Sequence, residues 1–161
     1  MPVSSDTDFF SESNYSGGRK SRRFNERRET SLPVRVRGRE TPQQEWAETG
    51  RLVNASRSGA CLRLARRIEA GQLIHLTAPI PSSMRAFDQA EKDFCVYAVI
   101  RSVTALPMAE AGKSQFEIGV AFIGKTPPAS FKVNPQTRYE TLPAPNREGL
   151  WRVRERPRAS E

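Results

Sequence analysis

The chain has 161 residues and a formal net charge of +8 at pH 7, and 37 % of its residues are hydrophobic. This length suits one ordinary domain, and the low hydrophobic content indicates a compact core with polar tails. No apolar run approaches the length of a transmembrane helix, and the N-terminus lacks the charged and apolar regions of a signal peptide. We therefore expect a cytoplasmic protein without membrane insertion.

The N-terminal residues 1–21 are rich in Ser, Asp and Gly and show no hydrophobic period, so we predict a disordered tail. A basic run follows at residues 19–28, and such a run usually stays solvated until an anion orders it. Arginine dominates the positive charge of the chain, and arginine both binds phosphate in a bidentate fork and stacks on flat rings. An anionic, aromatic ligand is a reasonable expectation from this composition.

Short strands are predicted along the middle of the chain. In the first, residues 32–37, Val34 and Val36 alternate with arginines, as in a half-buried strand. Further strands are predicted at residues 46–54, 60–64, 73–77, 94–103 and 116–123, with Trp46 as a plug of the core. One or two helical turns are predicted within residues 83–90. Six short strands without a long helix indicate an all-β barrel or sandwich.

The C-terminal part contains little predicted structure. Pro127, Pro128 and Pro135 leave room for one helical turn at most, around residues 129–133, because proline interrupts helix interiors. The rest is rich in proline and arginine and has Trp151 among its arginines, which predicts a mobile tail. We therefore expect three segments. They are a tail at residues 1–21, a domain at residues 22–124 and a Pro/Arg-rich tail at residues 125–161.

A polar hinge at residues 54–59 separates two apolar runs and predicts a strand–turn–strand. Asn54 and Ser56 can bond the local backbone and support the turn. Gly59 can adopt a positive φ and leaves room for a close approach to the backbone. Taken alone, this hexapeptide is compatible with a plain hairpin turn.

A second motif lies upstream, where Arg23 and Arg27 form an R-x-x-x-R pattern ahead of the predicted strand LPVRV. Asn54, Ser56 and Gly59 form an N-x-S-x-x-G pattern about thirty residues later. The order and spacing of the two motifs, together with the run EIGVAF at residues 117–122, resemble the PilZ domain, a bacterial receptor module for cyclic di-GMP. The resemblance covers residues 22–122 and implies a six-stranded antiparallel β-barrel.

The resemblance also implies roles for single residues. Arg23 and Arg27 would take the guanine and phosphate contacts from a flexible N-terminal loop, Asn54 and Ser56 would bind the other side of the ligand, and Gly59 would keep the turn open. In the family, an arginine at the position of Arg22 accompanies two intercalated ligands. The implied function is a second-messenger receptor that binds two cyclic di-GMP molecules per chain and signals to an unidentified protein partner. No cofactor beyond this ligand is expected.

Catalysis is not indicated by the residue pattern. The only histidine, His75, alternates within a predicted strand and suits a structural role, and no metal-ligand spacing is present. Two other functions stay open. One is a small basic barrel that binds single-stranded nucleic acid, and the other is a degenerate PilZ barrel that acts as a protein-interaction scaffold.

Overall fold

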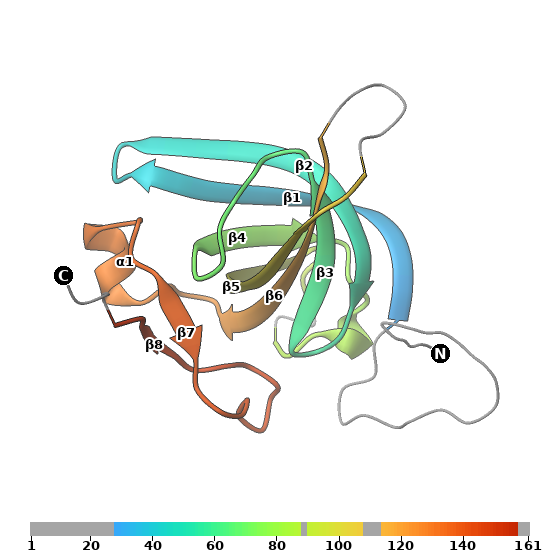
Figure 1. Ribbon diagram of the computed structural model, residues 1–161. Helices are drawn as coiled ribbons and strands as arrows, with labels where there is room; N and C mark the ends of the chain where they lie inside the picture. The colour runs from blue at the N-terminus through green and yellow to red at the C-terminus, as the bar shows by residue number, and fades with distance from the viewer. Residues whose placement is uncertain (1–27, 88–89, 108–113, 158–161) are drawn as a thin grey trace.

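The computed structural model describes residues 28–87, 90–107 and 114–157. Within them, six antiparallel strands close into a barrel in the order β1-β2-β3-β6-β5-β4 (Figure 1). These strands are β1 (Arg28–Thr41), β2 (Gln44–Ala55), β3 (Gly59–Leu64), β4 (Leu73–Ala78), β5 (Phe94–Ala105) and β6 (Phe116–Gly124). All six predicted strands are confirmed, and the fold is a closed barrel rather than a sandwich.

The barrel interior follows from the alternation of apolar and polar residues along the strands. Val34 and Val36 of β1 are almost fully buried, whereas the arginines between them are exposed. Trp46 differs from the prediction of a core plug. Its ring packs against the core but stays partly exposed, and it lies over Gly38, where an added Cβ would come within 2.5 Å of the indole.

The hairpin of β1 and β2 extends beyond the barrel (Figure 1). β1 pairs with β2 along nearly its whole length, but it pairs with β4 only at Arg35, Val36 and Arg37. The predicted helical segment at residues 83–90 is represented by the 3-10 helix η1 (Ser82–Met84), and residues 88–89 lie outside the described residues.

Residues 129–157, which we call the C-terminal module, fold against one side of the barrel instead of forming the predicted mobile tail (Figure 1). The module contains α1 (Ala129–Val133), the single helical turn that the prolines allow, and the antiparallel pair β7 (Tyr139–Thr141) and β8 (Val153–Glu155). Its anchors Phe131 and Tyr139 are buried with barrel residues on the outer face of β4, β5 and β6. The buried aromatic residues of this proline-rich segment are scattered and follow no hydrophobic period, so the sequence pattern did not predict that the module folds.

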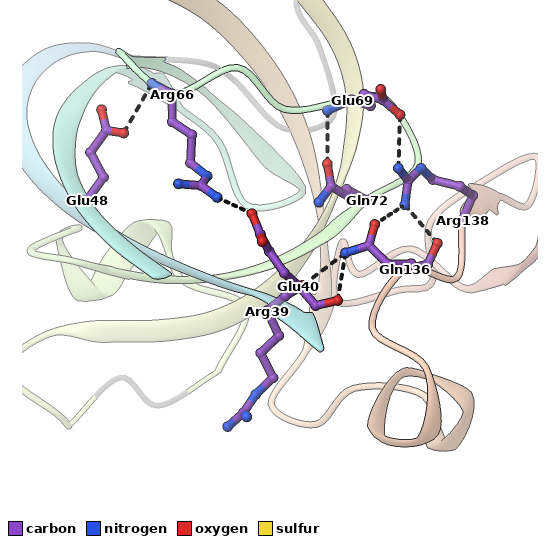
Figure 2. A network of polar contacts seen from close by, with 8 residues as sticks. All are labelled: Arg39, Glu40, Glu48, Arg66, Glu69, Gln72, Gln136 and Arg138. Carbon is purple, nitrogen blue, oxygen red and sulfur yellow. Dashed lines mark hydrogen bonds and ion pairs between the residues drawn. The ribbon is translucent and has the colours of Figure 1, made fainter. Parts of the chain in front are cut away.

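Polar contacts fasten the module to the end of the β1–β2 hairpin and to the segment between β3 and β4 (Figure 2). Gln136 Nε2 donates to the carbonyl oxygen of Glu40 at 3.0 Å, and Arg138 Nη2 pairs with Glu69 Oε1 at 2.9 Å. Arg66 pairs with Glu40 at 2.6 Å and so joins the same network. These exposed ion pairs are individually weak, and their value lies in fixing the orientation of the module.

Candidate ligand-binding site

The turn between β2 and β3 carries Asn54, Ser56 and Gly59, and its own backbone closes it. The Ser56 amide donates to the carbonyl oxygen of Gly59 at 2.8 Å, and Ser56 Oγ accepts from the Ser58 amide at 3.3 Å. A serine that supports a turn makes such local bonds. The predicted strand–turn–strand is therefore confirmed, with Asn54 only 6 % and Ser56 only 4 % exposed.

Asn54 combines burial with an unused hydrogen-bonding atom. Its Oδ1 is buried and accepts no hydrogen bond from the described residues. Asn54 lies opposite Glu29 of β1 and Cys61 of β3, and register shifts interrupt both ladders next to these pairs. A buried acceptor without a donor is costly, and functional sites often contain one. The Oδ1 of Asn54 is therefore a buried acceptor whose donor is not found among the described residues.

Gly59 serves a purpose different from the one expected. The glycines with positive φ among the described residues are Gly71, Gly124 and Gly149, so Gly59 does not use the left-handed region. A Cβ on Gly59 would instead lie 2.3 Å from the carbonyl oxygen of Val120 in β6. The close approach that the sequence suggested is thus made by a neighbouring strand, which leaves no room for a side chain.

The predicted arginines Arg22, Arg23 and Arg27 lie outside the described residues, so their positions are not part of the observed site. The described chain begins at Arg28, which follows Arg27 directly and is the first residue of β1. Arg28 pairs with Ala55, the residue between Asn54 and Ser56. The N-x-S-x-x-G turn therefore lies at the end of the β1–β2 ladder where β1 begins.

Residues of the C-terminal module also come close to this turn, which the sequence did not predict. Gly149, at φ +95°, approaches Arg57, the residue between Ser56 and Ser58, and an added Cβ would lie 3.4 Å from the Arg57 Cβ. Arg57 Nε is buried and has no hydrogen-bond partner in the described structure. The only signal in the sequence was the Asn-x-x-Gly pattern ahead of Trp151, which is typical of a turn.

His75 lies on the outer face of β4, away from the turn. Its Nδ1 is 3.4 Å from Arg37 Nη2, and its ring meets Tyr97 edge-on with centroids 4.8 Å apart. Burial lowers the pKa of His75, and the Arg37 charge lowers it further, while Glu45 opposes both. A neutral ring held between strands agrees with the structural role expected from the sequence.

Across the described residues, no group of three or more His, Cys, Asp or Glu side chains comes together to hold a metal ion. No helix in that part of the chain is long and apolar enough to cross a membrane. A hollow of about 250 Å³ lies on the C-terminal module and contains none of the predicted site residues. Its lining residues are Asn134, Gln136, Thr137, Arg138, Glu155, Arg156 and Pro157.

Comparison with protein families gives one match, in which the model of the PilZ domain covers residues 21–131. No curated protein matches the chain closely enough to count as a relative. Among solved structures, the inhibitor of motility MotI/DgrA of Bacillus subtilis is 18 % identical with a TM-score of 0.44. The match covers 70 % of this chain and 46 % of that protein.

Two further solved structures resemble the chain to a similar degree. The complex of K. pneumonia MrkH with c-di-GMP is 16 % identical with a TM-score of 0.45, covering 66 % of this chain and 45 % of that one. The PilZ domain of Escherichia coli YcgR with c-di-GMP is 14 % identical with a TM-score of 0.45, covering 66 % of this chain and 82 % of that one. The chain thus matches less than half the length of MotI/DgrA and MrkH.

Proposed function

This chain belongs to the PilZ domain family, and on that premise we propose that it is a cytoplasmic receptor for cyclic di-GMP. The main support within the structure is that β1 begins beside the N-x-S-x-x-G turn, at the residue that follows the R-x-x-x-R motif in the sequence. Arg28, next to Arg27 in the sequence, pairs with Ala55 beside Asn54. An R-x-x-x-R segment that enters the barrel at this point has only a short distance to span to the N-x-S-x-x-G turn.

The chemistry of the ligand matches the residue types available. Cyclic di-GMP carries two guanines and two phosphodiesters, and an arginine fork pairs with the O6 and N7 acceptors of guanine or with a phosphate. Arg23 and Arg27 would make these contacts from the N-terminal side. Asn54 has an unsatisfied acceptor and no charge to repel a phosphate, and Ser56 adds a hydroxyl group.

Binding would also order the arginine segment. Ordering costs roughly 1–2 kcal/mol per residue in backbone entropy, so the segment is fixed only when charge-assisted contacts offset that cost. The ordered segment, the ligand and the barrel would together form a surface that the free protein lacks. A protein partner that prefers this surface would respond to the ligand concentration through its difference in affinity.

Isothermal titration of the full chain tests the proposal, with GTP, cyclic GMP and a single-stranded oligonucleotide as competing ligands. We expect selective binding of cyclic di-GMP, and Arg23→Ala and Arg27→Ala should each weaken it by about tenfold or more without lowering the Tm. Arg35→Ala is the matched control, because Arg35 is exposed on β1 and belongs to neither motif.

The titration also separates the alternative functions. If cyclic di-GMP at about 100 μM produces no heat of binding and no shift in Tm, the receptor function is contradicted. The interaction-scaffold function then remains. Oligonucleotide binding that falls steeply with salt would support the nucleic-acid barrel instead, because contacts to many phosphates release counterions. Affinity for a compact dinucleotide should depend on salt much less.

A further inference from the structure

A compact loop at residues 146–151, which we call the C-terminal loop, lies within the C-terminal module between β7 and β8. The side chain of Asn146 organises it, with Oδ1 accepting from the amides of Glu148 at 2.9 Å and Leu150 at 3.0 Å. The Asn146 amide donates to the Leu150 carbonyl oxygen at 2.7 Å. Such an asparagine-supported turn holds its shape through local bonds.

This loop lies next to the candidate ligand-binding turn. Gly149 has no side chain, and the position of its missing Cβ is only 3.4 Å from the Cβ and the carbonyl oxygen of Arg57. Leu150, the next residue, packs against the barrel core. The backbone of the loop at Gly149 therefore passes close to Arg57, in the middle of the N-x-S-x-x-G motif.

Hydrogen bonds join the two segments through β6. The Phe122 amide donates to the carbonyl oxygen of Ser58 in the turn at 2.9 Å. The carbonyl oxygen of Phe122 accepts from the Trp151 amide at 2.8 Å. The guanidinium of Arg101 lies over the Trp151 ring, 4.8 Å from its centroid, and holds the end of the loop. One residue of β6 thus bonds the turn with its amide and the loop with its carbonyl.

The backbone bond from Ser56 to Gly59 closes the turn, but the side-chain bonds of Ser56 are long. Ser56 Oγ is 3.3 Å from Ser58 Oγ and 3.5 Å from the Gly59 carbonyl oxygen, both near the limit for hydrogen bonds. A site that presents fixed polar atoms to a ligand requires neighbours that lock its geometry. The C-terminal loop is the neighbour on the side of Arg57.

We propose that the C-terminal loop positions the N-x-S-x-x-G turn for its ligand, with Asn146 and Gly149 as positioning residues that do not touch the ligand. This inference rests on the proposed cyclic di-GMP function for the identity of the ligand. It assigns the C-terminal module a role in binding, and it makes ligand occupancy and the docking of the loop thermodynamically linked.

The test compares Asn146→Ala with Asn134→Ala in the full chain. Both asparagines are exposed, both belong to the C-terminal module, and both accept backbone amides through Oδ1, since Asn134 accepts from Gln136 at 3.0 Å. Of the two, Asn146 organises the loop that lies next to the turn. Tm measurements on both variants check that the barrel remains folded.

Hydrogen exchange without ligand is the first measurement. We expect the amides of Ser56 and Phe122, which bond within and beside the turn, to exchange faster in Asn146→Ala and at the native rate in Asn134→Ala. Equal rates in Asn146→Ala and the native chain, or equal acceleration in both variants, would overturn the inference. Hydrogen exchange tests whether the C-terminal loop positions the turn even if the native chain binds no cyclic di-GMP. The absence of binding would reject the proposed function separately.

Ligand affinity is the second measurement. Asn146→Ala should weaken cyclic di-GMP binding by about fivefold or more at an unchanged Tm, while Asn134→Ala binds like the native chain. In a Trp46→Phe background Trp151 is the only tryptophan, and its fluorescence should change on adding cyclic di-GMP. Native affinity in Asn146→Ala would contradict the linkage between ligand binding and loop docking. Trp151 fluorescence that stays the same when ligand binds would contradict it as well.

Discussion

At the position of Gly59, a Cβ atom would meet the carbonyl oxygen of Val120, a backbone atom of the adjacent strand that cannot rotate away. Gly59→Val must therefore separate β3 from β6 or distort the turn. We expect the free energy of unfolding to fall by at least about 1–3 kcal/mol, the usual cost of overpacking, and ligand affinity to fall with it. Urea denaturation measures the first effect. An unchanged unfolding midpoint would show that the strands separate here at no cost.

His75 provides a pH-dependent prediction at the same scale. Burial and Arg37 lower its pKa from 6.5, so below pH 6.5 the unfolded state binds a proton that the folded state resists. Its contribution to stability is present above that pH and is lost as pH falls toward the folded pKa. We expect the native chain to lose more stability between pH 7.5 and about pH 5.5 than His75→Gln does. Urea titrations at both pH values give the comparison, and equal losses would refute it.

At the scale of elements, α1 offers a buried and an exposed apolar residue within one helical turn. Phe131 is 6 % exposed and packs on the outer face of the barrel, whereas Val133 is 80 % exposed. Phe131→Ala should cost about 3 kcal/mol, the lower end for a buried phenylalanine, because this peripheral site can relax. Val133→Ala should leave the free energy of unfolding unchanged. Chemical denaturation of both variants tests whether the C-terminal module is docked in solution.

The arginine segment is the element whose behaviour the proposed function depends on. Charge-assisted contacts to the ligand would order it, so hydrogen exchange in residues 19–30 should slow strongly on adding cyclic di-GMP. Residues 94–103, which include most of the barrel strand β5, should barely change. Protection of residues 19–30 in the absence of ligand would mean that no ordering event occurs and that signalling runs through another part of the protein.

For the whole molecule, the open quantity is the number of ligands per chain. Arg22 precedes the R-x-x-x-R motif. A second dinucleotide adds two negative charges, which the Arg22 guanidinium can offset, and another guanine, on which the guanidinium can stack. We expect two cyclic di-GMP molecules per chain, and Arg22→Leu should shift the ratio toward one. Titration calorimetry at protein concentrations well above the Kd measures the ratio directly. A native ratio of one would count against the role of Arg22.

The amino-acid sequence by itself determined the strands and the motif of the turn. Alternation of apolar and polar side chains is a local property. Val34 and Val36 therefore predict a half-buried strand from their immediate neighbours in sequence alone. Asn54, Ser56 and Gly59 likewise lie within six residues, and the bonds of Ser56 that close the turn are local. Short-range patterns are readable because the groups that decide them are neighbours in sequence.

The tertiary structure alone decided what the long-range contacts require. Whether six strands close into a barrel depends on the pairing of β1 with β4, and the need for a glycine at residue 59 comes from Val120 on another strand. The docking of the C-terminal module depends on Phe131 and Tyr139 meeting apolar residues of β4, β5 and β6, far away in sequence. The composition of the segment did not predict this docking, because proline and arginine dominate it. A few widely spaced aromatic side chains supply its buried apolar contacts.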